Sequence, residues 1–327
     1  MDTSSAARAF YQYLDQQGVD LVTSMGTTQL SKDFHLRGVV ALKDIAPKQD
    51  LVNIPYECAI NLGLQGADPV PPALEFLKSY CREGQDGRKA YYELLPGFTG
   101  DDCLGSTNFF SDRALQELQY PMMVDETLER RHRVQQAYDR LGNDMKWIDG
   151  SPLTMDQLLW AVWLITSRVL TVQGDEGQSY RLLIPYLDMC NHDRKSPHLL
   201  TGRAVPGGSL KVVAQSPVKK GAPATICYGG GVEGNDRFLQ DYGFLDASEE
   251  AYTLTAQQLL GKRRITGGVN AGKSVTMADR DRTLDALRQT TVSEDRQLLA
   301  SETDRQVQSA IQFRLNLKLA LSKYIDI

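Results

Sequence analysis

Cysteine and histidine are scarce in this sequence of 327 residues. The five cysteines form no Cys-x-x-Cys pair, and because oxidising compartments favour paired cysteines, we expect reduced and mostly buried thiols. The four histidines lack the spacing of zinc ligands, so we expect no metal ion. The residues concerned are Cys58, Cys81, Cys103, Cys190, Cys227, His35, His132, His192 and His198.

Long apolar runs are also missing. The longest run, around residues 158–166, is far shorter than the roughly 20 residues that cross a bilayer. The first residues include Asp2 and no apolar segment of the kind found in secretory signals. We therefore expect no membrane partner and a cytoplasmic or nuclear location, or a chloroplast location if a transit peptide has been removed.

The sequence has no strong excess of one charge. Its formal net charge is -5, and its few basic clusters, at residues 130–133 and 262–264, are short and mixed with acidic residues. Strong binding to a nucleic-acid backbone needs a long basic surface, so we expect no nucleic-acid partner. Hydrophobic residues make up 42%, which is typical of a globular protein whose core needs no disulfides.

Strand patterns and helix patterns occupy separate stretches of the sequence. Short strands are predicted at residues 39–42, 51–54, 181–187, 210–214 and 224–228. Helices are predicted at residues 3–18, 74–80, 91–95, 113–118, 125–141, 154–165 and from about 253 to the end. Because strands and helices are segregated rather than alternating, the sequence predicts an α+β fold and not a doubly wound sheet.

Local signals place some helix ends and one inner face. Ser111 and Thr154 are expected N-caps, and Gln157 lies in capping-box position after Thr154. The apolar residues of the last helices are expected to form an inner face, made of Leu298, Leu299, Val307, Ala310, Ile311, Leu315, Leu317 and Leu319.

An apolar stretch at residues 184–192 ends in Asn191 and His192. One interpretation is a strand that runs into a turn, since asparagine favours turns. The other is a ligand site, in which the amide of Asn191 and the ring or backbone of His192 bind a small molecule. The residues alone leave both interpretations open.

The glycines of residues 229–234 follow a predicted strand with G-x-G-x-x-G spacing. A dinucleotide site also needs a βαβ unit with a crossover helix, which the following residues do not predict. We therefore favour a loop whose glycines permit positive φ. Further along, Tyr242 and Phe244 flank a glycine, and such aromatics either pack in a core or line a narrow slot.

The order of these segments resembles the SET-domain methyltransferases, in particular the branch that contains the Rubisco large subunit methyltransferase. An Asn-His pair is followed by Tyr228 and then by Tyr-Gly-Phe at residues 242–244. Further resemblances cover most of the chain: residues 37–45 resemble the opening strand, 91–96 and 115–118 the helical insertion, 160–168 a helix of the domain, and 293–314 the helical tail.

This resemblance implies a fold, a division into domains and a reaction. We expect a β-rich SET domain at residues 1–250, with short strands in small sheets, a pseudoknot-like arrangement and a helical insertion at about residues 65–165. A mostly helical, substrate-binding domain is expected at residues 251–327. The implied enzyme transfers a methyl group from S-adenosylmethionine to a lysine of a non-histone protein, and we expect it to be a monomer.

The resemblance also implies roles for single residues. Asn191 and His192 are expected to hold the amino group and adenine of the cofactor, and Arg168 to pair with its carboxylate. The expected cofactor-binding residues are Gly38, Val39, Val40, Arg168, Asp188, Asn191, His192 and Tyr228. Tyr228 corresponds to the catalytic tyrosine, and the expected substrate channel is lined by Leu170, Tyr242 and Phe244.

The sequence departs from the family pattern at three places. Residues 221–222 are Gly-Ala where the family often has Gly-Glu, so a supporting carboxylate is missing. The loop after Tyr228 is one residue longer and richer in glycine than in close relatives. The C-terminal tail is shorter than the usual domain of the family.

Two alternatives stay open beside the lysine methyltransferase. The first is a protein-histidine methyltransferase of the same fold, although Val169 and Leu170 after Arg168 favour lysine as the target. The second is a catalytically inactive SET module that binds partners through its helical tail. The retained Asn191, His192 and Tyr228 argue against this alternative.

Overall fold

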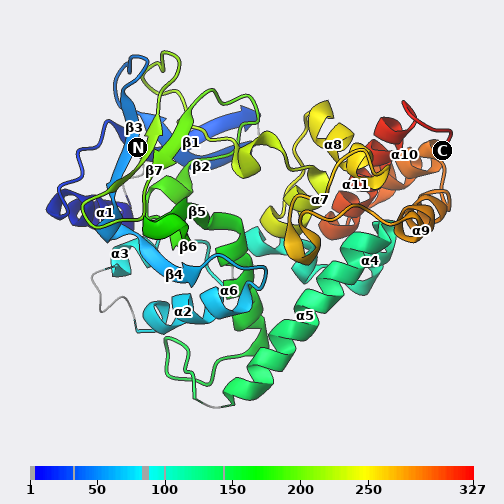
Figure 1. Ribbon diagram of the computed structural model, residues 1–327, viewed down its shortest axis with the longest axis horizontal. Coiled ribbons are helices and arrows are strands. Elements are labelled where there is room, and N and C mark those ends of the chain that lie inside the picture. The colour runs from blue at the N-terminus through cyan, green and yellow to red at the C-terminus, as the bar shows by residue number, and fades with distance from the viewer. Residues whose placement is uncertain (1–3, 32–33, 83–87, 99–100, 143) are drawn as a thin grey trace. The chain divides into compact units, whose positions relative to one another are not determined.

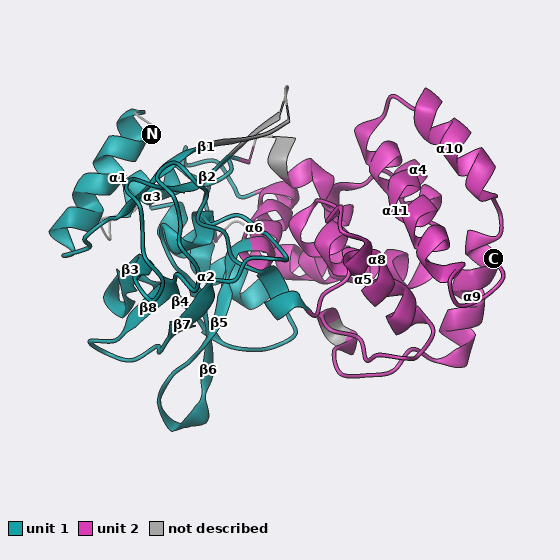
Figure 2. Ribbon diagram, turned by 90° about the horizontal axis from the view of Figure 1, so that it is seen from above, with its two compact units in different colours: residues 1–97, 145–153, 168–231 teal, residues 98–144, 154–167, 232–327 magenta. Residues whose placement is uncertain are grey.

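The computed structural model describes residues 4–31, 34–82, 88–98, 101–142 and 144–327. The chain forms two compact units, each assembled from separate stretches of sequence (Figure 2). Unit 1 holds residues 1–97, 145–153 and 168–231, and unit 2 holds residues 98–144, 154–167 and 232–327. The units thus follow boundaries other than the predicted domains 1–250 and 251–327, which stay a prediction.

Unit 1 contains the strands that the structure describes, and they pair in small antiparallel sheets (Figure 1). One sheet is the hairpin of β1 (Thr23–Ser31) and β2 (Phe34–Ala41). The second has the order β3 (Asp50–Pro55), β8 (Ser209–Val213), β7 (Leu199–Gly202), and the third has the order β4 (Ile60–Leu64), β6 (Ser179–Leu183), β5 (Leu170–Gln173). Short strands in small sheets are what the sequence predicts.

An extended segment at residues 222–228 joins β2 to the turn that carries Asn191. On one side it makes an antiparallel bridge between Pro223 and Val40, and on the other a parallel bridge between Ile226 and His192. The sequence prediction of a regular strand at residues 224–228 is wrong, because the segment pairs with two partners at isolated points. Proline also has no N–H to offer a continuous ladder.

The helices of unit 1 cover its sheets with an apolar face. In α1 (Ser5–Gln16) the side chain of Ser4 caps the helix by accepting from Ala7 N at 3.1 Å. Phe10 of α1 is fully buried, and its ring centroid lies 5.7 Å from that of Tyr91 in α3 (Lys89–Tyr92). The helix α2 (Val70–Tyr80) has Pro71 and Pro72 in its first turn, where proline is favoured.

Unit 2 is largely helical. Its helices are α4 (Asp112–Glu117), α5 (Pro121–Leu141), α6 (Met155–Arg168), α7 (Asn235–Arg237), α8 (Glu249–Leu259), α9 (Met277–Leu287), α10 (Val292–Ser301) and α11 (Arg305–Leu321) (Figure 1). Arg168, the last residue of α6, belongs to unit 1. Within the described ranges, no helix combines the length and apolar character needed to cross a bilayer.

The predicted caps of unit 2 are confirmed. Ser111 Oγ accepts from Ala114 N at 3.2 Å at the start of α4. At the start of α6, Thr154 Oγ1 accepts from Gln157 N at 3.2 Å, and Gln157 Oε1 accepts from Thr154 N at 2.8 Å. This reciprocal pair is the predicted capping box, and it forms because both groups lie within one turn of each other.

The predicted inner face of the last helices is confirmed in part. Val307, Ala310, Ile311 and Leu317 are buried in the core of unit 2. The prediction is wrong for Leu298 and Leu319, whose exposed fractions are 41% and 39%. Apolar spacing identifies a stripe on a helix, but it does not say how much of that stripe a neighbouring helix covers.

A buried ion cluster ties α10 to α11 and α4. The carboxylate of Asp295 accepts from Arg314 Nε at 2.8 Å and from Lys318 Nζ at 2.7 Å, and the three side chains are at most 2% exposed. Arg314 also pairs with Glu117 of α4. Burial lowers the pKa of Lys318, and its contacts with Asp295 oppose that change.

Removing the central carboxylate leaves Lys318 without this carboxylate partner and leaves Arg314 with Glu117 as its remaining one. We expect Asp295→Ala to lower the free energy of unfolding by about 3 to 5 kcal/mol. The matched control is Glu75→Ala, which breaks the exposed pair with Lys78 and is expected to cause no measurable change. Chemical denaturation followed by circular dichroism measures both, and equal effects of the two variants contradict the prediction.

Candidate functional site

The backbone between β6 and Asn191 is a strained turn. The strand β6 ends at Leu183, earlier than the predicted strand end at residue 187, and a 3-10 turn follows at Leu187–Met189, which agrees with the interpretation of a strand that runs into a turn. Tyr186 has φ 74°, an uncommon conformation for an aromatic residue. Its buried hydroxyl lies 2.9 Å from Thr23 Oγ1 of β1. Such strain persists only where the surroundings determine it, and it often marks functional sites.

Asn191 packs closely against Gly38 of β2, where a larger residue would have to displace its side chain. Asn191 Nδ2 donates to the carbonyl of Arg37 at 2.9 Å. A Cβ atom on Gly38 would lie only 2.3 Å from the same Nδ2, which is closer than real Cβ atoms come. Among the described residues, no group donates to Asn191 Oδ1, so this oxygen is free to accept from a ligand.

Asp188 is a buried carboxylate with two partners. Its Oδ2 accepts from Tyr91 Oη at 2.9 Å and from Arg168 Nη1 at 3.3 Å, and its backbone carbonyl accepts from the same Nη1 at 3.1 Å. Burial raises the pKa of Asp188, while Arg168 and Tyr91 oppose the change. Two buried atoms of this pair, Asp188 Oδ1 and Arg168 Nε, have no hydrogen-bond partner in the described part of the chain.

Tyr228 lies over the turn that carries Cys190 and His192. Its hydroxyl donates to the carbonyl of Cys190 at 2.8 Å, and its backbone N–H donates to His192 Nδ1 at 3.0 Å. The second bond requires Nδ1 of His192 to be unprotonated, so a neutral ring carries its proton on Nε2. Burial of the hydroxyl raises the pKa of Tyr228 well above its usual value.

The glycine loop after Tyr228 takes the conformation that the sequence favours. Gly229, Gly230 and Gly231 have φ values of 59°, 61° and 78° in succession. Side chains rarely adopt this region, so the run needs glycine. The loop leads to α7 and the π-helical segment Phe238–Tyr242 that continues it, and no described strand follows to complete the βαβ unit of a dinucleotide site.

The remaining predicted residues are spread over both units. In unit 1, the carbonyl of Val39 accepts from Ala224 N at 2.8 Å, so this group is already engaged. Leu170 lies on β5 opposite Leu182. Tyr242 and Phe244 lie in unit 2, where their ring centroids are 6.1 Å apart. The expected roles of all these residues stay a prediction.

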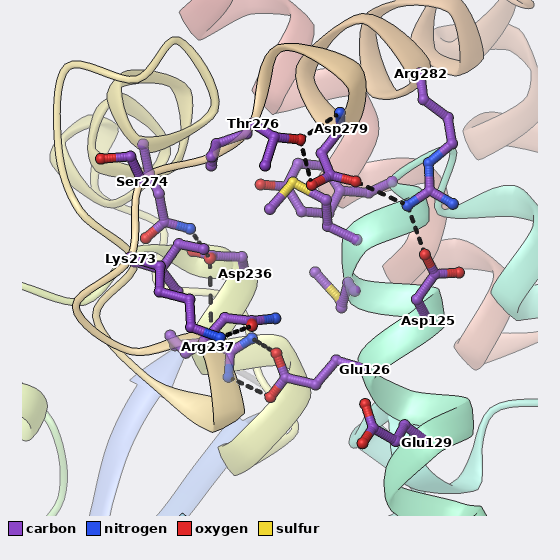
Figure 3. A pocket seen from close by; sticks show the side chains of 17 residues that line it. Asp125, Glu126, Glu129, Asp236, Arg237, Lys273, Ser274, Thr276, Asp279 and Arg282 are labelled. Atoms are coloured by element: carbon purple, nitrogen blue, oxygen red, sulfur yellow. Dashed lines mark hydrogen bonds and ion pairs between the residues drawn. The ribbon is translucent and has the colours of Figure 1, made fainter.

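A polar cavity of about 180 Å³ in unit 2 is lined by α5, α7, α9 and the loop before α9 (Figure 3). Its acidic side chains have partners of their own. Glu126 accepts two bonds from Arg237 at 2.9 and 2.8 Å, and Arg282 pairs with both Asp125 and Asp279. Because these charges satisfy one another, we interpret the cavity as part of a stabilising network.

Sequence reasoning missed the support that Tyr91 and the carbonyl of Cys190 give to the site. The Tyr91 hydroxyl contacts a carboxylate 97 positions along the chain. Residues 91–96 were notable only for their family resemblance, and no local pattern reveals a partner so distant in sequence. The predicted residues Gly38, Arg168, Asp188, Asn191, His192 and Tyr228 do come together in unit 1.

Comparison with known proteins gives relatives that include named N-methyltransferases. No family model matches the chain. The chain is 26% identical over 278 residues to the chloroplastic ribulose-1,5 bisphosphate carboxylase/oxygenase large subunit N-methyltransferase of Pisum sativum, with 78% of this chain and 55% of that protein covered. It is 26% identical over 223 residues to the ribosomal lysine N-methyltransferase set10 of Schizosaccharomyces pombe, with 63% and 39% covered.

Among solved structures, the chain is similar to the SET domain of LSMT bound to lysine and AdoHcy. The TM-score is 0.67 at 19% sequence identity, and the match covers 99% of this chain and 90% of that chain. The chain therefore has the SET-domain fold, and the predicted α+β class and the predicted resemblance are confirmed. The chain spans about half the length of the Rubisco methyltransferases that it matches.

The contact between Gly38 and Asn191 gives a direct test of this geometry. We expect Gly38→Ala to lower the free energy of unfolding by about 1 to 3 kcal/mol, because the new methyl group collides with Asn191. The second change Asn191→Ala removes the colliding atoms and is expected to restore part of the loss. Gly97→Ala is the control, since a Cβ there meets no atom within 4 Å. Thermal and chemical denaturation of the variants measure the effect, and a loss in the Gly97 variant of the same size contradicts it.

Proposed function

We propose that the protein is an S-adenosylmethionine-dependent protein-lysine N-methyltransferase. The observation that carries this proposal is that Tyr228 forms hydrogen bonds with the turn at residues 188–192. The same turn is bound to β2 through Asn191, next to Gly38. Relatives named as lysine N-methyltransferases and a fold neighbour bound to lysine and AdoHcy support it.

Unused polar atoms of the site fit a donor with an amino-acid end. Asn191 Oδ1 is an acceptor for an ammonium, and Arg168 Nε is a donor for a carboxylate. Both atoms lack partners among the described residues, and S-adenosylmethionine carries both of the groups that they would bind. When bound, this cofactor supplies a methyl carbon that its sulfonium makes electrophilic. Gly38, Val39, Val40, Asp188 and His192 complete the proposed cofactor site.

The hydroxyl of Tyr228 is proposed to align the incoming amine. Since it donates its proton to the carbonyl of Cys190, its oxygen keeps lone pairs that accept an N–H from the substrate. Its raised pKa keeps the phenol neutral near pH 7, so the residue does not act as a base. Its contribution is therefore orientation and electrostatics, which together lower a barrier substantially.

The amine must reach this site as a neutral nucleophile. A lysine in water has a pKa of about 10.4 and is nearly always charged at neutral pH. A site that excludes water and holds a positive sulfonium favours the neutral amine and lowers that pKa. Leu170, Tyr242 and Phe244 are proposed to line the channel that provides these surroundings.

The test of the proposal is the variant Tyr228→Phe. We expect turnover to fall at least about 100-fold, because one hydrogen-bonding group at the reacting atoms is removed. Binding of S-adenosylmethionine, measured by calorimetry, should be nearly unchanged. Tyr180→Phe is the control, since the Tyr180 hydroxyl contacts only the nearby Gln178 among described residues. Undiminished methyl transfer from radiolabelled donor by the Tyr228 variant removes that residue from the catalytic role.

The substrate is proposed to be a non-histone protein, recognised in part by the helical residues 251–327. Incubation of a methyl-depleted lysate with labelled donor, followed by mass spectrometry, identifies the labelled protein and residue. A methylated histidine would replace lysine in the proposal. Failure of the wild-type protein to bind S-adenosylmethionine would favour an inactive partner-binding module.

A plastid is the location we propose for this activity. The relatives from Pisum sativum and Nicotiana tabacum are named as chloroplastic, which favours the chloroplast among the locations that the sequence left open. Fractionation of cells that express the tagged full-length protein tests the location directly.

A further inference from the structure

We propose that Tyr91 is a positioning residue of this site. Its hydroxyl holds Asp188 in the orientation that leaves N–H groups of Arg168 available for the carboxylate of the methyl donor. This inference rests on the proposed function, and it assigns a role to a residue of α3 rather than to the motif residues themselves.

The first support is the geometry of the Tyr91 hydroxyl. The side chain is fully buried, and its hydroxyl donates to Asp188 Oδ2 at 2.9 Å. Its ring is held on two sides, with centroids 5.7 Å from the ring of Phe10 and 5.7 Å from the ring of Tyr92. Because the ring is packed on two sides, the position of the Tyr91 hydroxyl is fixed. Its hydrogen bond therefore fixes the position of the Asp188 carboxylate.

The second support is the way Asp188 shares its oxygens. Oδ2 serves both Tyr91 and Arg168, while the buried Oδ1 has no partner in the described ranges. A buried carboxylate that loses a donor seeks a replacement, because an unsatisfied charge in the interior is costly. Without the Tyr91 hydroxyl, we expect Asp188 to turn and engage Arg168 through both oxygens.

This rotation of Asp188 would occupy the N–H groups of Arg168 that the carboxylate of the methyl donor needs. Arg168 presently gives only Nη1 to Asp188, and its buried Nε has no partner in the described part of the chain. A guanidinium that chelates a carboxylate uses two of its N–H groups at once. The donor carboxylate would then lose its partner, even though Arg168 itself remains in place.

The third support is that residues 91–94 also contact the part of the site that contains Asn191. Leu94 follows Tyr91 by one turn, and its carbonyl accepts from the guanidinium of Arg37. The carbonyl of Arg37 in turn accepts from Asn191 Nδ2 at 2.9 Å. Residues 91–94 therefore support both Asp188 and Asn191, which we propose to face the two charged groups of the donor.

The neighbouring residue provides a matched control. Tyr92 is also buried, at 6% exposure, and its hydroxyl lies 2.7 Å from Ser79 Oγ of α2. Tyr91→Phe and Tyr92→Phe each remove one hydrogen-bonded hydroxyl from the same segment and leave the ring. A general loss of packing affects the two variants alike, whereas the proposed role affects only the first.

The experiment measures the dissociation constants of two donors by calorimetry on the full chain. One is S-adenosylmethionine, and the other is decarboxylated S-adenosylmethionine, which keeps the sulfonium and ammonium but lacks the carboxylate. For Tyr91→Phe we expect roughly 10- to 100-fold weaker binding of S-adenosylmethionine. The reason is that the hydrogen bond from Arg168 to the carboxylate of the donor is lost. The decarboxylated donor should bind this variant as it binds the wild type.

Two further readouts separate positioning from structure. Saturating donor should restore kcat of Tyr91→Phe while KM for the donor stays raised, because Tyr228 is untouched. Adding Tyr91→Phe to Arg168→Ala should cause little further loss of donor affinity, since the two changes act through one contact. Tyr92→Phe should match the wild type with both donors.

Several outcomes overturn the inference. Equal weakening of both donors, a matching loss in Tyr92→Phe, or unchanged binding of S-adenosylmethionine by Tyr91→Phe each show that the hydroxyl does not act through Arg168. If the wild-type protein itself binds no S-adenosylmethionine, the proposed function fails and the inference falls with it. The wild-type measurement therefore distinguishes the two failures.

Discussion

One buried carboxylate holds together the site of unit 1. The side chain of Asp188 is buried away from solvent, and a buried charge is tolerated only when other groups form hydrogen bonds or ion pairs with it. Its partners come from distant parts of the chain, Tyr91 from α3 and Arg168 from the end of α6. Adjacent to it, Tyr186 stores backbone strain and Asn191 lies against Gly38. The arrangement of the turn therefore depends on long-range contacts more than on its own sequence.

Features that depend on neighbours within one turn were predictable from the sequence. The capping box of Thr154 and Gln157 and the cap of Ser111 formed as expected, because both partners lie three residues apart. The conformation of the glycines after Tyr228 follows the same logic, since positive φ is a property of single residues. The contact of Tyr228 with Cys190 and His192 was expected only through resemblance to a family, because no local pattern requires it.

Features set by distant packing were not predictable. The segment at residues 224–228 has a strand-like composition, yet it divides its bonds between β2 and the turn of His192. Leu298 and Leu319 have the right spacing for a core but lie where neighbouring helices leave them exposed. Tyr91 reads as an ordinary core aromatic, and its importance becomes visible only once Asp188 is seen beside it. In each case the deciding partner is far away in sequence.

The acid–base character of the site limits the reactions that it supports. Burial raises the pKa of Tyr228 and of the Cys190 thiol well above their usual values, so neither group gives up a proton near neutral pH. Asp188 is engaged by Arg168 and Tyr91, and His192 Nδ1 is occupied by a backbone N–H. None of these groups is arranged to remove a proton from an ammonium ion. A transfer to an amine at this site therefore requires the amine to lose its proton before alignment, which the exclusion of water and a nearby positive charge both favour.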